Sequence, residues 1–209
     1  MIKGTPVYII VMFVYTDGAC SNNGKSSAVA SIGIYIGPND ARNVSRRITG
    51  KQTNNVAELT AIIEVYTILK QDILSGKQIT ICSDSRYAIK CCSDYGKKCS
   101  EHWDTLDIPN KDLVRHAYEL FCDLDNVKFM YIKAHTGKND MHSLGNDEAD
   151  KLATSAFPKF AIPNRIYLNV SYDQKDIAKQ LDCKWDVNKK KWYIYDDNKK
   201  KDIIMSLFN

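Results

Sequence analysis

Four acidic residues of this chain have a type and spacing that could support catalysis. They lie at the predicted ends of strands or within predicted helices. They are Asp17, Glu58, Asp84 and Asp150. If the fold brings them together, their charges repel one another unless a cation neutralises them, and hard divalent cations prefer carboxylate oxygens. The four acids therefore predict a metal centre, and an oxygen-rich site of this kind accepts Mg²⁺ or Mn²⁺.

Each acid also has an ordinary structural explanation. Asp17 belongs to a common turn dipeptide, and Glu58 could close a capping box begun at Asn55. Asp84 could cap the helix that follows it, and Asp150 could be a solvated helical residue. Taken singly, none of the four acids establishes a site.

The elements expected to position the acids begin with three apolar or alternating segments. These segments are Tyr8–Thr16, Ala28–Ile36 and Asn43–Gly50. Gly, Pro, Asn and Asp between them supply turn geometry, so the segments predict an antiparallel three-strand meander. Apolar residues then recur at helical spacing from Val56 to Leu69, with Asn54 and Asn55 as capping candidates.

A strand and helix series follows the meander. It comprises a strand Gln78–Ser83, a helix from Ser85, a helix Lys111–Leu124, a strand Val127–Lys133 and a helix from about Gly145 to Ala156. A meander followed by such a series predicts an α/β fold, a mixed five-stranded sheet with flanking helices. Asp17 is expected after the first strand, Glu58 in the first turn of the first helix, and Asp84 after the fourth strand.

The four acids stand within five short motifs. In chain order these are Thr16–Gly24, Gln52–Glu58, Ser83–Ser85, His135–Gly137 and Gly145–Ala153. Across residues 7–157 this order closely resembles the type 1 ribonuclease H family. The resemblance implies that all four acids hold two Mg²⁺ ions, with Asp17 bridging both and Asp147 as the alternative to Asp150. It also implies that His135 assists proton transfer or product release.

The function implied by the resemblance is that of an endoribonuclease. It would hydrolyse the RNA strand of RNA–DNA hybrids by two-metal-ion catalysis, giving 5′-phosphate and 3′-hydroxyl ends. One alternative is a catalytically idle module that binds RNA–DNA hybrids, against which the presence of all four acids argues. The other is a related nuclease of the same superfamily that cuts DNA.

The resemblance also implies residues that contact the hybrid. Candidates for contacts to hydroxyls and bases are Asn23, Asn54 and Asn55. Candidates for a pocket that holds a phosphate of the DNA strand are Lys51, Thr53 and Asn110. Many relatives grip the DNA strand with a basic, tryptophan-rich protrusion, and the segment Tyr95–Trp103 is a shorter and less aromatic counterpart. Tyr95 is a candidate contact there, whereas Trp103 could equally well pack in the core.

The segment Phe157–Pro163 contains two prolines and predicts a domain boundary. Residues 1–157 would form the catalytic domain, 158–164 a linker, and 165–209 a small α+β accessory module. In that module we expect a strand Arg165–Tyr172, a helix Asp173–Leu181 and a strand Lys191–Tyr195. It resembles a small uncharacterised module that is sometimes fused to nucleic-acid enzymes. Its ten basic and seven acidic residues suggest contacts to nucleic acid, although lysine runs are often only solvated.

Composition limits the remaining possibilities. A formal net charge of +4 permits a polyanionic partner without requiring one. The longest apolar stretch is far too short to cross a bilayer, so no membrane association is expected. Seven cysteines without a Cys-x-x-Cys pair argue against disulfides and zinc, and for a reducing, intracellular compartment. A monomer is the default expectation.

Overall fold

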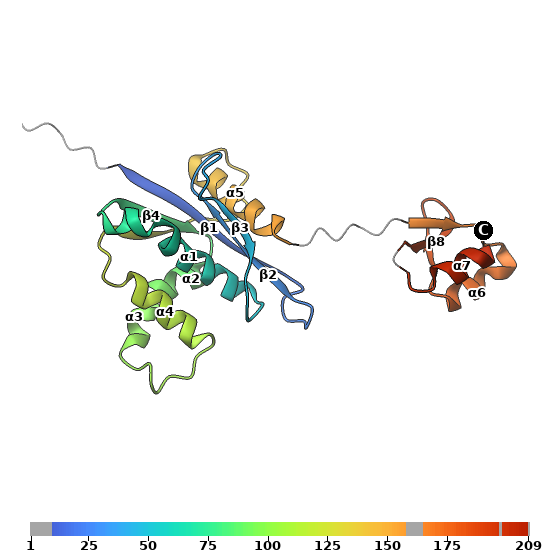
Figure 1. The fold of residues 1–209 in the computed structure, drawn as a ribbon, viewed down its shortest axis with the longest axis horizontal. Helices are drawn as coiled ribbons and strands as arrows, with labels where there is room; N and C mark the ends of the chain where they lie inside the picture. The colour runs from blue at the N-terminus through green and yellow to red at the C-terminus, as the bar shows by residue number, and fades with distance from the viewer. Residues whose placement is uncertain (1–9, 158–164, 197, 209) are drawn as a thin grey trace, which may run out of the picture. The chain divides into compact units, whose positions relative to one another are not determined.

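The computed structural model describes residues 10–157, 165–196 and 198–208. The chain divides into two compact units, residues 1–157 and 158–209 (Figure 1). The predicted linker 158–164 and the first residues of the predicted first strand lie outside the described residues.

The first unit is built on a five-stranded sheet with the strand order β3-β2-β1-β4-β5. Its strands are β1 (Val11–Ser21), β2 (Val29–Tyr35), β3 (Val44–Arg47), β4 (Gln78–Ser83) and β5 (Val127–Tyr131). Neighbours β1, β2 and β3 pair antiparallel, whereas β1 with β4 and β4 with β5 pair parallel. The predicted mixed sheet with its opening meander is confirmed.

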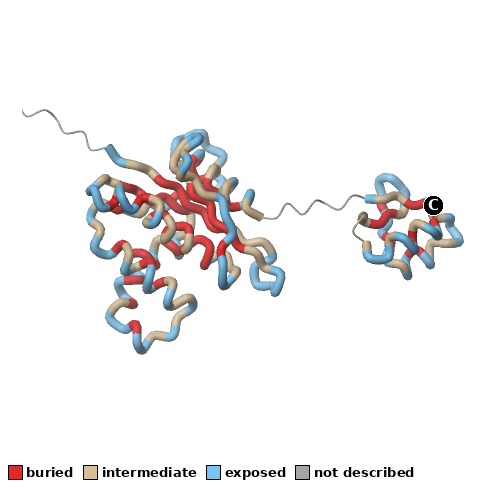
Figure 2. Tube along the Cα trace, in the orientation of Figure 1, coloured by how far each residue is buried: buried red, intermediate tan, exposed pale blue. Residues whose placement is uncertain are grey.

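Five helices flank this sheet. They are α1 (Asn54–Leu74), α2 (Arg86–Cys92), α3 (Asp94–Ser100), α4 (Lys111–Phe121) and α5 (Met141–Ser155). The apolar residues of α1 that recur at helical spacing, among them Leu59 and Ile62, are fully buried against the even-numbered residues of β1 and β2. Helix α5 lies on the other side of the sheet, where Ser31 of β2 donates a hydrogen bond to the carbonyl of Ala153 at 2.6 Å. Buried residues accordingly run along the middle of the sheet (Figure 2).

Two glycines set how closely the helices approach the sheet. A methyl group on Gly18 of β1 would overlap the backbone of α1 at Glu58, and one on Gly33 of β2 would overlap the backbone of α5 at Ala149. Each glycine therefore lets a helix that carries predicted site residues pack directly against a strand.

Several predicted boundaries are wrong in ways that have local causes. Asp17 lies inside β1 rather than after it, because the strand continues through Gly18, which pairs with Ile32. Helix α1 is capped by Thr53, whose side chain accepts from the amide of Val56 at 3.3 Å. Neither Asn54 nor Asn55 is therefore the cap.

The last helix of the first unit also begins earlier than predicted. It starts at Met141 rather than near Gly145, because the carboxylate of Asp140 accepts hydrogen bonds from the amides of His142 and Ser143. Helix α3 was not predicted, and it occupies most of the segment Tyr95–Trp103.

The second unit is a three-stranded antiparallel sheet with the order β6-β8-β7. Its elements are β6 (Arg165–Leu168), the 3-10 turn η1 (Tyr172–Gln174), α6 (Lys175–Gln180), β7 (Lys184–Asp186), β8 (Lys191–Tyr195) and α7 (Lys201–Phe208). The predicted α+β class and strand β8 are confirmed, whereas β7 and α7 were not predicted. The predicted first strand is too long, because Tyr172 already belongs to the turn before α6.

Candidate functional site

The candidate site lies where β1, β4, α1 and α5 meet. The carboxylate groups of Asp17, Glu58 and Asp84 each offer an oxygen, and these three oxygens lie within 4.8 Å of one another. The residues come from β1, α1 and the position directly after β4, so segments 41 and 26 residues apart along the chain converge on one point. Among the described residues, these three form the one group of acidic, histidine or cysteine side chains that are close enough together to hold a metal ion.

Glu58 reaches the group because α1 lies close against β1. The amide of Gly18 donates a hydrogen bond to Glu58 Oε2 at 3.1 Å, and the side chain of Asn54 donates to Oε1 at 3.4 Å. The side chain is therefore directed toward Asp17 and does not close the capping box that was considered from sequence. Glu58 is 6% exposed, so its carboxylate has little solvent to stabilise its charge.

Asp84 is positioned by a residue to which sequence analysis assigned no role. The side-chain amide of Asn146, on α5, donates to Asp84 Oδ2 at 3.0 Å. Asn146 is 1% exposed, and its Oδ1 atom is buried without a hydrogen-bond partner among the described residues. Its position inside the motif Gly145–Ala153 was the available signal in the sequence.

Asp150 and His135 lie close to the three-carboxylate group without being part of it. Asp150 is half-buried on α5, and its charge raises the pKa of Asp17. His135 is exposed in the segment between β5 and α5, and its backbone has a left-handed φ of 48°. The charge of His135 lowers the pKa of Asp17. Asp147, the alternative fourth ligand, is half-buried one position after Asn146 and lies outside the group.

The electrostatics of the group are those of carboxylates crowded together in a buried place. Burial first, and then the charges of Asp84 and Asp150, raise the pKa of Asp17 to about 7, against the opposing effect of the hydrogen bond from Gly18. Burial also raises the pKa of Glu58 well above its ordinary value, followed by the charges of Asp17 and Asp84. A bound cation would stabilise the charged carboxylates and so oppose both shifts.

These residues fit a divalent metal ion. All the converging ligands are oxygens, which Mg²⁺ and Mn²⁺ prefer. The buried Oδ1 of Asn146 adds an acceptor beside Asp84 that has no partner within the described part of the chain. Asp17, Glu58 and Asp84 could hold such ions directly, with Asp150 as the next carboxylate.

The predicted substrate residues form two sets around the start of α1. The carbonyl oxygen of the Asn23 side chain accepts from the amide of Asn54 at 3.4 Å, which links the first turn to the helix that carries Glu58. Asn55 is exposed beside Asn54. Three predicted contact residues thus lie together at the end of the helix nearest the acidic group.

The second set surrounds a hollow. The ammonium of Lys51 donates to Asn110 Oδ1 at 2.9 Å, and Asn110 donates to the hydroxyl of Tyr87 at 3.3 Å. A hollow of about 430 Å³ at the start of α4 is lined by Lys51, Asn110 and Lys111, together with one acid, Asp112. Two cations beside a helix N-terminus suit an anion such as a phosphate. Thr53 is occupied as the cap of α1.

The shortened protrusion offers little aromatic surface. Trp103 is 8% exposed and packs in the core, so its structural role is the one observed. Tyr95, on α3, is 36% exposed. Tyr95 is the aromatic residue of this segment that remains available for contacts.

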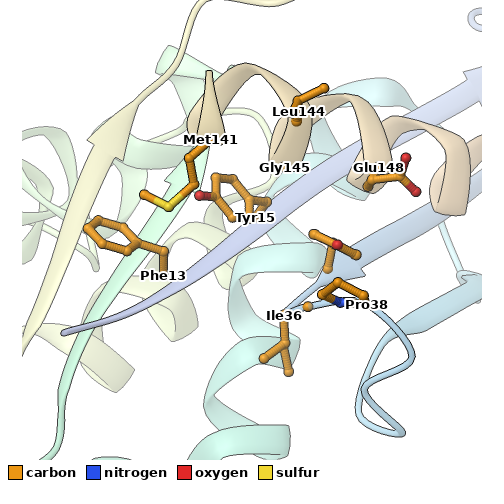
Figure 3. A pocket seen from close by; sticks show the side chains of 10 residues that line it. Phe13, Tyr15, Ile36, Pro38, Met141, Leu144, Gly145 and Glu148 are labelled. Carbon is orange, nitrogen blue, oxygen red and sulfur yellow. The ribbon is translucent and has the colours of Figure 1, made fainter. Parts of the chain in front are cut away.

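A separate apolar hollow of about 370 Å³ lies between α5 and the sheet (Figure 3). Phe13, Tyr15, Met141 and Leu144 line it, and the acids Asp17, Glu58 and Asp84 do not. The hydroxyl of Tyr15 lies 3.2 Å from His142 Nδ1, and burial raises the pKa of Tyr15 to about 12. This hollow is therefore part of the packing of α5 and lies apart from the acidic group.

Comparison with known proteins identifies the first unit. The family model described as RNase H matches residues 10–157. The chain belongs to the ribonuclease H family. Ribonuclease H of Schizosaccharomyces pombe is 39% identical over 145 residues, which cover 67% of this chain and 50% of that protein. Ribonuclease H of Clostridium botulinum strain Hall is 30% identical over 158 residues, which cover 72% of this chain and 98% of that protein. The predicted family is confirmed.

Solved structures agree on the ribonuclease H fold. LC11-RNase H1, isolated from compost, is 22% identical with a TM-score of 0.50, over 71% of this chain and 96% of that one. A prototype foamy virus protease-reverse transcriptase is 21% identical with a TM-score of 0.57, over 70% of this chain and 21% of that one.

The second unit matches a different model, described as a domain of unknown function, over residues 165–203. The predicted C-terminal module is thereby confirmed as a known type of uncharacterised module. The chain spans about half the length of the first curated relatives it matches, such as ribonuclease H1 of Rattus norvegicus, at 48% of that protein. No helix in the described part of the chain is long and apolar enough to cross a membrane.

Proposed function

We propose that this protein is an endoribonuclease that hydrolyses the RNA strand of RNA–DNA hybrids with two divalent metal ions. The observation that carries the proposal is the group formed by Asp17, Glu58 and Asp84, whose oxygens lie within 4.8 Å of one another in a chain of the ribonuclease H family. The names and sequence identities of the relatives support the substrate class.

The chain's own residues would act mainly by positioning. Asp17, Glu58, Asp84 and Asp150 would hold the ions, with Glu58 oriented by Gly18 and Asp84 by Asn146. Divalent ions in such a site lower the pKa of water and stabilise the charge that develops on a leaving oxygen. His135, exposed and close enough to influence Asp17, would exchange a proton with the product or with solvent.

Recognition of the hybrid would combine hydroxyl and phosphate contacts. The side chains of Asn23, Asn54 and Asn55 would contact the strands beside the acidic group, where 2′-hydroxyls distinguish RNA from DNA. Lys51 and Asn110 would hold a phosphate of the DNA strand in the hollow that they line. Phosphate contacts of this kind position a duplex without reading its sequence.

The test is cleavage of a strand-labelled RNA–DNA hybrid beside double-stranded RNA, double-stranded DNA and single-stranded RNA. We expect cutting only in the RNA of the hybrid, dependent on Mg²⁺ or Mn²⁺ and abolished by a chelator. Asp84→Asn should lower the rate by on the order of 10³-fold, because a charged ligand is lost while Asn146 still has an acceptor. Asp125→Asn, at an exposed position away from the group, is the matched control.

Three further results decide between functions. The new 5′ ends should accept a phosphate label from a kinase only after phosphatase treatment. That result would show that cleavage leaves a 5′-phosphate, and therefore a 3′-hydroxyl on the other product. Tight binding of the hybrid without cleavage would contradict the proposal and favour an idle binding module. Cleavage of DNA would favour a related DNA nuclease.

A further inference from the structure

The two sides of the sheet in the second unit differ in what covers them. Leu168 of β6 and Ile194 of β8 pack with Ala178 of α6 and with Ile204 and Phe208 of α7. Because successive residues of a strand point to opposite sides, Tyr167, Tyr193 and Tyr195 belong to the other side. Both helices of the unit therefore pack on the side away from these tyrosines.

The second side carries rings and cations in matched pairs. We call it the tyrosine face, and it comprises Tyr167, Tyr193, Tyr195, Arg165, Lys184, Asp186, Lys189 and Lys191. The ring centroids of Tyr167 and Tyr193 are 5.9 Å apart, and those of Tyr193 and Tyr195 are 5.5 Å apart. Arg165 lies 4.6 Å over Tyr193, Lys184 lies 4.8 Å over Tyr195, and Lys189 lies 4.5 Å over Tyr167.

Basic residues outnumber acidic ones in the second unit, and several of the basic ones lie on this face. Residues 165–209 contain ten basic and seven acidic residues. Among the described residues placed on the tyrosine face, Arg165, Lys184, Lys189 and, by strand alternation, Lys191 lie with the acid Asp186, which pairs with Arg165 at 2.8 Å. Four cations beside one acid attract an anionic partner to this face.

We propose that the tyrosine face binds single-stranded nucleic acid. Unpaired bases would stack on Tyr167 and Tyr195, which are partly exposed on either side of the buried Tyr193, while the cations that now lie over the rings would move to the phosphates. This exchange is favourable because stacking of a base on an aromatic ring is stronger than an exposed cation–π contact, and the cation gains a phosphate. A duplex could use only the cations, because its bases are already stacked and paired.

An apolar groove on the other side of the unit provides an internal comparison. It encloses about 590 Å³ and is lined by Trp185, Trp192, Tyr172, Lys175 and Lys179. Lys179 pairs with Asp176 at 3.1 Å, so the groove has less free positive charge than the tyrosine face. Its two lysines are therefore suitable positions for control substitutions that change the net charge equally.

The experiment measures fluorescence anisotropy of a labelled 12-nucleotide single-stranded DNA with the full chain, across salt concentrations. We expect Lys184→Gln with Lys191→Gln to weaken binding about tenfold and to reduce the salt slope by roughly 1.4, since each phosphate contact on a single strand contributes about 0.7. Lys175→Gln with Lys179→Gln should weaken binding less than about twofold. Tyr195→Leu should weaken binding about fivefold or more without changing the salt slope. Tyr195→Phe keeps the aromatic ring and should bind as tightly as the unaltered protein.

The outcomes separate the possibilities. Equal losses in the two lysine pairs would show that net charge alone drives binding and would overturn the proposal, as would a loss confined to the groove pair. Absence of single-strand binding by the unaltered protein would also overturn it, as would preference for a duplex that does not depend on the ring of Tyr195. Because single-stranded DNA is not a hybrid, none of these results depends on whether the first unit cleaves hybrids. Thermal unfolding of each variant checks that the unit remains folded.

Discussion

The acidic group of the first unit and the tyrosine face of the second hold charge in opposite ways. Asp17 and Glu58 are 7% and 6% exposed, and like charges lie against one another. Arg165 and Lys184 are exposed, and each lies over an aromatic ring. Buried charge depends on close contacts with the backbone, whereas exposed charge depends on little beyond its own side chain. Substitutions should therefore have large, coupled effects in the first region and small, additive effects in the second.

The largest effect should come from the contact that brings α1 to the acidic group. Gly18→Ala would place a methyl group against the backbone of Glu58, which cannot move as a flexible side chain can. We expect a loss of about 3 kcal/mol in the free energy of unfolding, measured by urea denaturation. Gly37→Ala is the control, because nothing lies within 4 Å of its added carbon. Equal stability of the two variants would show that α1 need not approach β1 so closely.

The next effect concerns the repulsion inside the group. The pKa of Asp17 is about 7 in the folded protein, against an ordinary value of 3.8. The folded state thus keeps a proton that the unfolded state releases, so the stability of the metal-free protein should fall as pH rises from about 4 to about 7. Asp17→Asn should make this slope shallower, leaving the part that the buried Glu58 contributes, and should stabilise the metal-free protein at pH 8 by on the order of 2 kcal/mol.

Thermal unfolding in chelator, at several pH values, checks this expectation. Added Mg²⁺ should raise the unfolding temperature of the unaltered protein at pH 8 and leave that of Asp17→Asn nearly unchanged. Asp125→Asn, exposed at the surface, should behave like the unaltered protein in both respects. A metal-free protein whose stability rises between pH 4 and pH 7 would contradict the account of the acidic group.

A smaller effect is expected where a neutral residue supports the group. Asn146→Ala removes the donor to Asp84, and loss of such a supporting contact typically costs 10- to 100-fold in metal affinity or activity. We expect a decrease of about that size in hybrid cleavage, partly restored by higher Mg²⁺ concentration. Lys151→Ala, on the same helix with a 67% exposed side chain, should cleave normally. An unchanged Mg²⁺ requirement in Asn146→Ala would assign Asn146 a purely structural role.

The contrast between the regions also explains what sequence could predict. The mixed sheet followed from apolar periodicity and turn residues, which are local signals. The start of α5 was missed because the capping by Asp140 outweighs the helix-breaking tendency of Gly145. Asn146 was missed because its value lies in a contact with Asp84, 62 residues away. The tyrosine face could not be predicted because it depends on strand β7 and on the register in which β6, β7 and β8 pair. The lysine runs of the sequence indicate neither of these.

The smallest effect should come from an exposed cation in the first unit. Lys51 is exposed like the cations of the tyrosine face, although it belongs to the first unit and contacts Asn110 at 2.9 Å. If exposure rather than location determines the size of an effect, Lys51→Ala should raise the KM for the hybrid only about three- to tenfold and leave kcat unchanged. It should also reduce the salt slope of hybrid binding by about 1, as expected for one lost phosphate contact. Lys70→Ala, at another exposed position, should change neither quantity. A large fall in kcat for Lys51→Ala would mean that the hollow lined by Lys51 and Asn110 is coupled to the acidic group. The distinction between buried and exposed charge would then fail within the first unit.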